Sequence, residues 1–139
     1  MKMIFLLLLS SLSLTAFAWV VDVYTTENVG INGTRYAKEN HVLNFNLIDS
    51  KDNFEDLLNK RIGKLPANEI EARAQLKNFA VNNQELIRSI ARSWRVNFNF
   101  QSLGLNKSDL PVAVINGRVF KQVTNLDVLL RRLDKHEGN

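Results

Sequence analysis

The segment "DLPVAVINGRVF", residues 109–120, places a proline directly before a short apolar run and an Asn-Gly pair directly after it. A second apolar run follows Asn116 and Gly117. Asn-Gly between two such runs is the strongest short-range signal for a tight hairpin, because a type I′ turn needs a positive φ at both central residues. Proline has no N–H to donate and is tolerated at the first position of a strand. The segment predicts an antiparallel hairpin that starts at Pro111.

Two earlier segments also have the composition of strands. Residues 19–26 are rich in apolar and β-branched side chains, and residues 41–49 place Leu43, Phe45 and Leu47 on one face. The turn-rich connection between them is too long for a tight hairpin. We therefore expect these two strands to pair in parallel through a right-handed crossover.

Apolar residues at helical spacing predict helices over residues 53–63, 68–81, 82–100 and 124–138. Ser50 and Asp52 offer N-cap oxygens before the first helix, Gly63 ends it, and Asn68 opens the second. The third helix carries an apolar stripe that is predicted to pack in the core. The stripe consists of Ile87, Ile90, Ala91, Trp94 and Phe98.

The fourth helix has an expected N-terminal cap pair, Thr124 and Asp127, and Val123 and Val128 have the spacing of a hydrophobic staple. The order along the chain is then strand, loop, strand, three helices, hairpin and helix. This order predicts an α/β fold with a mixed four-stranded sheet flanked by helices. A helical insertion precedes the proline-led hairpin.

The first residues have the pattern of a signal peptide. Lys2 precedes an apolar and Ser/Thr-rich run that ends in Ala16-Phe17-Ala18, the small-x-small pattern that a signal peptidase accepts. The run is shorter than the roughly 20 residues of a membrane-spanning helix. We expect residues 1–18 to be a cleavable signal peptide and residues 19–139 to be a single exported domain without a membrane span. An uncleaved N-terminal anchor stays open as the alternative.

The composition excludes several classes of chemistry. The chain has no cysteine, so it forms no disulfide, no thiolate nucleophile and no Cys-ligated metal site. Its two histidines, His41 and His136, lack metal-ligand spacing, so we expect no metal and no cofactor. The formal net charge of +4 is below the clustered charge of a nucleic-acid binder, and no direct nucleic-acid contact is expected.

The order of elements, with Pro111 directly before the third strand and a last helix that closes the sheet, resembles the thioredoxin-like fold. In redox-active members of that fold, a cis-proline at this position faces a Cys-x-x-Cys motif after the first strand and helps to bind an extended substrate. The corresponding positions here are Thr25, Thr26, Glu27 and Asn28. The resemblance implies a cis bond before Pro111 and a scaffold without redox chemistry.

Several motifs spread over nearly all of residues 19–139 carry a second resemblance. They include "YTT", "RSWRVNFNFQSLGLNKSDLPVAVINGRVF" and "TNLDVLLRRL". Together they resemble a family of short exported proteins that are encoded in integrating conjugative elements and have no established activity. The resemblance implies a periplasmic protein that helps to assemble or stabilise a conjugative type IV secretion apparatus. Its partners would be other exported conjugative-transfer proteins. The best-matching positions are Trp94, Leu103-Gly104, Lys107, Leu110-Pro111, Ala113-Val114 and Gly117-Arg118.

The leading interpretation is a redox-inactive binding module and not an enzyme. The Pro111 loop, the end of the first strand and the exposed edge of the hairpin can accept an extended peptide by strand addition. A second candidate is a docking face for an acidic partner, whose alternative is a set of solvated side chains with stems that cover the edge of the core. The predicted peptide contacts are Thr25, Thr26, Leu110, Pro111 and Arg118, and the predicted docking face is Arg88, Arg92 and Arg95.

Two alternatives from other functional classes stay open. One is a periplasmic hydrolase that uses carboxylates or the hydroxyls of Thr25 and Thr26, although a hydroxyl is a weak nucleophile without an activating base. The other is a secreted effector or inhibitor that acts outside the producing cell.

Overall fold

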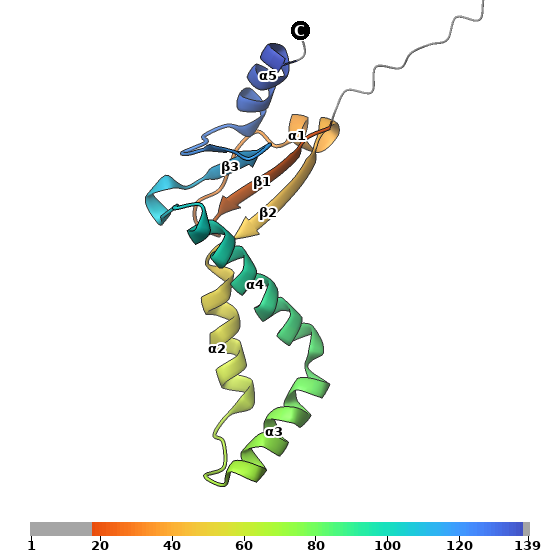
Figure 1. The fold of residues 1–139 in the computed structure, drawn as a ribbon, viewed down its shortest axis with the longest axis vertical. Helices are drawn as coiled ribbons and strands as arrows, with labels where there is room; N and C mark the ends of the chain where they lie inside the picture. Colours follow the sequence, from red (N-terminus) through yellow and green to blue (C-terminus); the bar gives the residue numbers. More distant parts are fainter. Residues whose placement is uncertain (1–17, 138–139) are drawn as a thin grey trace, which may run out of the picture.

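The computed structural model of the chain describes residues 18–137 (Figure 1). The predicted signal peptide lies outside the described residues except for Ala18. In chain order the elements are β1 (Val20–Thr25), α1 (Arg35–Asn40), β2 (Val42–Leu47), α2 (Ser50–Ile62), α3 (Glu69–Asn82), α4 (Gln84–Ser102), the short 3₁₀-helix η1 (Lys107–Asp109), β3 (Val112–Ile115), β4 (Arg118–Phe120) and α5 (Leu126–Glu137).

The four strands form one sheet in the order β2-β1-β3-β4. β1 pairs in parallel with β2, while β3 runs antiparallel to both β1 and β4. The predicted α/β fold with a mixed four-stranded sheet is therefore confirmed, and so is the parallel pairing of the two early strands.

The hairpin between β3 and β4 forms at the predicted turn. Asn116 and Gly117 have φ values of 50° and 73°, the positive pair that a type I′ turn requires. The strand before the turn begins at Val112, directly after Pro111, and the Leu110–Pro111 peptide bond is cis. The hairpin is therefore confirmed.

One face of the sheet packs against α1 and α5. Alternate residues of a strand point to the same face, so Val21 and Val23 of β1 lie beside Ala113 and Ile115 of β3. Helix α1 adds Ala37 to this cluster. The buried members of this first apolar cluster are Val21, Val23, Ala37, Ala113, Ile115, Val123, Leu126 and Leu130.

The opposite face carries a second, smaller apolar cluster. Tyr24 and Val112 are paired across β1 and β3 and point to this face. Phe100 from the end of α4 packs on them, and the rings of Tyr24 and Phe100 lie 5.7 Å apart. The cluster leaves the other end of this face open, because Val20 and Val42 remain about half exposed. The buried members are Tyr24, Ile48, Phe100, Leu105, Leu110 and Val112.

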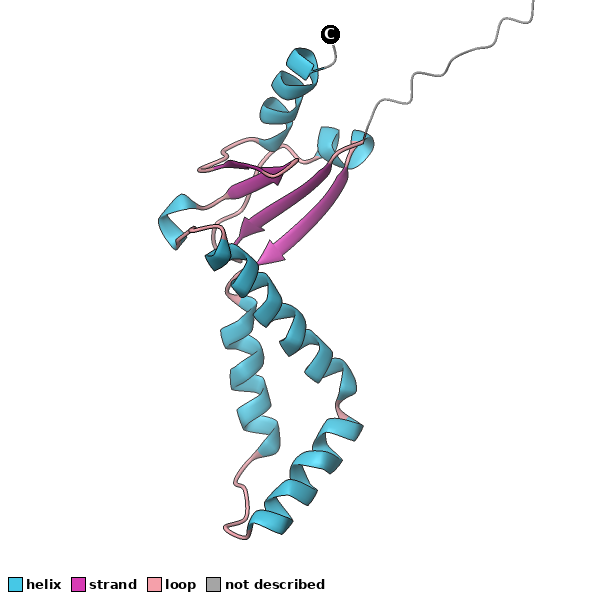
Figure 2. Ribbon diagram, in the orientation of Figure 1, coloured by secondary structure: helices cyan, strands magenta, loops and turns pink. Residues whose placement is uncertain are grey.

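The helical insertion, residues 50–102, extends away from the sheet as an arm (Figures 1 and 2). Helix α2 starts at the sheet, α4 ends at it, and α3 forms the far end of the arm. Asn68 caps α3 as predicted, since its side chain accepts hydrogen bonds from the N–H groups of Ile70 and Glu71. No described residue of α2 or α3 is fully buried. The arm therefore adds surface to the molecule and little core.

The predicted core face of α4 is wrong. Ile87, Trp94 and Phe98 are 38%, 50% and 71% exposed, whereas α4 buries Leu86, Ser93 and Phe100. Lys51 of α2 lies over the Trp94 ring, 3.8 Å from its centre, and covers one side of it. Periodicity identified an amphipathic helix, but the direction in which α4 leaves the sheet decides which side is covered.

Helix α1 was expected to be part of a loop. It has only six residues and is too short to show a helical period. Its stability comes from contacts distant in sequence, since Ala37 is fully buried and its N–H donates to the Asp127 carboxylate of α5 at 3.2 Å. This contact also gives Asp127 a different role from the predicted one.

The start of α5 is held by the loop before α1. The N–H groups of Leu126 and Asp127 donate to the carbonyls of Asn32 and Gly33. The Asn125 side chain accepts from the N–H of Val128 at 3.1 Å, so it supplies the cap. Gly33 has a φ of 67°, and a Cβ there would clash with the Asn125 side chain, so this position requires glycine.

The predicted cap pair of Thr124 and Asp127 is therefore wrong. The predicted staple is not supported either, because Val128 is 46% exposed while Val123 is buried.

Leu130 and Val128 provide a matched test of the first apolar cluster. Leu130→Ala removes a fully buried side chain, and we expect it to lower the free energy of unfolding by about 2–5 kcal/mol. Val128→Ala on the same helix changes an exposed side chain and should stay within about 0.5 kcal/mol of the parent. Urea unfolding followed by circular dichroism measures both. Equal effects would contradict the assignment of the core.

Candidate functional site

A cleft of about 280 Å³ lies where β2 meets the base of the arm. β2 contributes its last residues, α2 its first turns, and α4 its middle. The cleft therefore joins the edge of the sheet to both helices that carry the arm. It is lined by Phe45, Asn46, Leu47, Ser50, Phe54, Ser89, Arg92, Ser93 and Val96.

The backbone of β2 presents unpaired groups beside this cleft. The N–H groups of Val42 and Ile48 donate to carbonyls of Trp19 and Thr25 at 2.8 and 2.9 Å. Backbone groups alternate in direction along a strand, so those of the odd-numbered positions point away from β1. Within residues 18–137, the only intramolecular partner on that outer side is the Ser50 hydroxyl, which donates to the Leu47 carbonyl at 2.8 Å. The outer groups belong to Leu43, Phe45 and Leu47.

The two edges of the sheet differ in how they are protected. Natural proteins protect sheet edges with very short strands and charged side chains. β4 has both features, because it has three residues, begins at Arg118 and is followed by Lys121. β2 has six residues without a charge, and its Phe45 side chain is 47% exposed. The unprotected edge is therefore β2.

Arg92 gives the cleft a positive charge. It lies on α4 within the lining, and no carboxylate in residues 18–137 pairs with it. Its neighbour Arg88, one turn earlier, lies 3.8 Å from Glu85. The Ser89 hydroxyl in the same wall also makes no hydrogen bond within the described residues. A guanidinium and a hydroxyl beside apolar walls suit a ligand with an apolar side chain and a neighbouring carboxylate.

Four of the five predicted peptide contacts lie at one end of the sheet. Thr25 and Thr26 at the end of β1 lie at the same end of the sheet as Leu110 and Pro111, because Tyr24 pairs with Val112. Thr25 is buried and its hydroxyl donates to the Val29 carbonyl, and Thr26 accepts from the N–H of Val29 at 3.1 Å. Leu110 is buried in the second cluster. These hydroxyls therefore hold the loop that follows β1.

Arg118 lies at the other end of the sheet. It pairs with Ile115, which in turn pairs with Val21 near the start of β1. Its guanidinium forms an ion pair with Glu137 of α5. The structure therefore separates Arg118 from the other four predicted contacts.

The predicted docking face is continuous on α4. Arg88, Arg92 and Arg95 recur at intervals of four and three residues, so they share one flank of the helix, and all three are exposed. Only Arg92 of the three lines the cleft. The flank thus extends the positive charge of the cleft along the arm.

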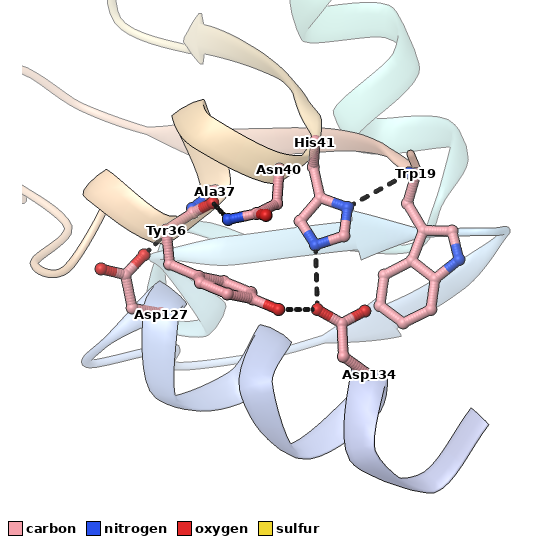
Figure 3. Close-up of polar contacts among 7 residues, drawn as sticks. All are labelled: Trp19, Tyr36, Ala37, Asn40, His41, Asp127 and Asp134. Atoms are coloured by element: carbon pink, nitrogen blue, oxygen red, sulfur yellow. Dashed lines mark hydrogen bonds and ion pairs between the residues drawn. The ribbon is translucent and has the colours of Figure 1, made fainter. Parts of the chain in front are cut away.

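A partly buried polar cluster that sequence reasoning missed joins Trp19, directly before β1, to α1, the α1–β2 junction and α5 (Figure 3). The N–H of Trp19 donates to His41 Nδ1 at 3.2 Å, so the neutral ring carries its hydrogen on Nε2 and donates to Asp134 Oδ2 at 3.2 Å. The hydroxyl of Tyr36 donates to the same oxygen. The Asp134 carboxylate that accepts this bond raises the pKa of Tyr36 above its ordinary value. Local sequence carries no signal for this cluster, because Asp134 is 93 residues from His41.

These contacts bear on the hydrolase alternative. A general base needs a free nitrogen or oxygen within reach of the proton that it removes. Both ring nitrogens of His41 are occupied, and its side chain is only 3% exposed. Among the described residues, no group of three or more His, Asp or Glu side chains is placed to hold a metal ion. The geometry therefore gives His41, Asp134 and Thr25 structural contacts.

Comparison of the chain with family models, with curated proteins and with solved structures finds no match in any of the three. Within residues 18–137, no helix is both long enough and apolar enough to cross a membrane.

Asp109 provides a test of how the Pro111 loop is held. Its carboxylate accepts from the N–H of Asn106 at 2.9 Å and lies 3.1 Å from Lys121 Nζ. The Asn106 bond first, and Lys121 second, hold the pKa of Asp109 below its ordinary value. We expect Asp109→Asn to lower the melting temperature at pH 7. The difference should shrink below about pH 4, the ordinary pKa of Asp, and vanish below the lowered pKa of the folded state.

Thermal unfolding at a series of pH values measures this effect. Asp56→Asn is the control, because Asp56 is exposed in the middle of α2 and makes no hydrogen bond or ion pair within residues 18–137. A difference between Asp109→Asn and its parent that is the same at pH 2 and pH 7 would contradict the assignment.

Proposed function

We propose that this protein is a binding module that holds an extended segment of another protein along the outer edge of β2. The open, uncharged edge of β2 beside the cleft is the observation that carries the proposal. The bound segment adds a strand next to β2, places an apolar side chain in the cleft and brings a carboxylate to Arg92.

The energetics require both parts of this site. A hydrogen bond of this kind contributes a net of about 1 kcal/mol. The outer side of Leu43, Phe45 and Leu47 offers three N–H groups and two free carbonyls, and about five such bonds contribute about 5 kcal/mol before the cost of association, so the backbone alone binds weakly. An apolar side chain buried in the cleft adds about 1.5–3 kcal/mol. The cleft and Arg92 thus supply specificity, and the backbone of β2 supplies orientation.

We further propose that the scaffold is thioredoxin-like. The sheet order β2-β1-β3-β4, the single parallel pair and the position of Pro111 before β3 support this assignment. The absence of cysteine leaves such a scaffold without thiol chemistry, so its work is recognition.

The wider role that we propose is in a conjugative DNA-transfer apparatus of the type IV secretion class. The support is the resemblance of its motifs to exported proteins of integrating conjugative elements and the pattern of its first residues. In this proposal the protein is periplasmic, and the segment on β2 belongs to another exported transfer protein.

A selection of phage-displayed random peptides on the immobilised protein tests the chemistry of the cleft. We expect enrichment of extended sequences in which an apolar residue stands near Asp or Glu. Arg92→Glu should weaken the enriched peptides by about tenfold or more and shift the selection away from acidic residues. Arg88→Glu is the matched control on the same helix, outside the cleft lining. No enrichment, or an acidic preference that survives Arg92→Glu, would contradict the proposal.

Two substitutions at Phe45 test the edge itself. Phe45→Ala removes the side chain, while Phe45→Pro also removes the outward N–H without breaking a hydrogen bond to β1. We expect Phe45→Pro to bind the enriched peptides more weakly than Phe45→Ala by roughly fivefold, about one hydrogen bond. Equal affinities of the two variants would argue against strand addition.

Complementation tests the wider role. A donor strain that lacks the gene should transfer its element less often, and the parent gene should restore transfer where the Phe45→Pro gene does not. Unchanged transfer without the gene would exclude the role in conjugation and leave the peptide-binding result intact.

A further inference from the structure

Among the described residues, the contacts of the fold begin at Trp19. Ala18 is exposed and makes no hydrogen bond within the described residues. Trp19 makes three kinds of contact: its N–H donates to His41, its carbonyl accepts from the N–H of Val42, and its indole stacks on the His41 ring. Within residues 18–137, the first residue with such contacts is thus the one that follows the small-x-small pattern of Ala16-Phe17-Ala18.

The backbone nitrogen of Trp19 lies in a defined polar site (Figure 3). His41 Nδ1 accepts a hydrogen bond from it at 3.2 Å. The other ring nitrogen, Nε2, donates to the Asp134 carboxylate. The indole and imidazole rings are nearly parallel, with centres 5.1 Å apart and planes 8° apart. The Tyr36 hydroxyl donates to the same oxygen of the Asp134 carboxylate.

The charge at this site is suited to a cation. Asp134 is the acidic group of the cluster, and its carboxylate accepts bonds from two neutral donors, Tyr36 and His41. Arg131 lies over the Tyr36 ring, 4.5 Å from its centre, and forms no ion pair with Asp134. A cation at the Trp19 nitrogen would face the neutral imidazole of His41, whose Nε2 is hydrogen-bonded to the Asp134 carboxylate.

We propose that this site binds the chain's own α-ammonium group, which forms when a signal peptidase hydrolyses the Ala18–Trp19 bond. Water supplies a hydroxyl group to the Ala18 carbonyl carbon and a hydrogen to the Trp19 nitrogen. The new α-amine has an ordinary pKa of about 7.7–8.0 and takes up a further proton near neutral pH. The inference rests on the export that is part of the proposed function, but not on the binding of any partner.

Cleavage changes the strength of the contact. Before cleavage the Trp19 nitrogen is a neutral peptide N–H with a single hydrogen to donate. After cleavage it is a charged donor with three hydrogens, and hydrogen bonds from a charged donor are roughly twice as strong as neutral ones. Cleavage of the Ala18–Trp19 bond therefore stabilises the junction of β1, β2 and α5. The uncleaved chain is less stable to unfolding than the cleaved one.

The exported protein, purified from the periplasm, tests this inference. Its intact mass should show a chain that starts at Trp19. Acetylation at about pH 6.5 favours the α-amine over lysine, because the lysine pKa is higher. Acetylation restores a neutral amide, and we expect it to lower the melting temperature by about 3 °C or more. The same modification of Asp134→Asn should produce a much smaller change.

Nitrogen-15 NMR of the histidine side chains gives a second measurement that does not depend on the stability of a variant. Acetylation of the parent protein should shift the Nδ1 resonance of His41 and leave that of His136, which is exposed, unchanged. A different first residue, equal melting temperatures before and after acetylation, an undiminished effect in Asp134→Asn, or an unmoved His41 resonance would each overturn the inference. None of these results depends on peptide binding at β2, so the two proposals fail separately.

Discussion

The central position of β1 is the constraint on which the rest of the structure depends. β1 pairs in parallel with β2 on one side and antiparallel with β3 on the other. Its alternate side chains enter two apolar clusters: Val21 and Val23 face α1 and α5, while Tyr24 faces the end of α4. Segments from both halves of the chain therefore meet on one strand of six residues. The polar cluster of His41 and Asp134 holds the start of β1, at the end of the strand opposite Tyr24.

The candidate site follows from how the chain leaves β2. After Leu47 the chain enters α2 and the arm directly and adds no further strand, so β2 remains an edge. Helix α4 then returns to the sheet and brings Arg92 and Val96 beside the last residues of β2. The arm therefore has two effects on the site: it leaves the edge open, and it builds the wall of the cleft next to it. Natural proteins usually protect an exposed edge with charge, proline or a very short strand, and β2 has none of these.

Local patterns predicted much of the fold and a smaller part of the site. The hairpin at Asn116-Gly117 was predictable because the turn type depends on two adjacent residues. Arg92 was identified as part of a charged flank, but the cleft that it lines was not. Thr25 and Leu110 were predicted as contact residues and are buried, and Arg118 lies at the far end of the sheet with Glu137. Spacing identifies an amphipathic face, but it does not identify what covers that face.

The sequence by itself determined that thiol chemistry is impossible, that the chain forms a hairpin and a helical insertion, and that its first residues resemble a signal peptide. These features depend on residue identity and on neighbours within a few positions. The tertiary structure alone decided which sheet edge is open, which side of α4 is exposed, and that His41 meets Asp134. Such features depend on strand order and helix direction. Those are set by the burial of apolar surface between segments far apart in the chain, which no local pattern records.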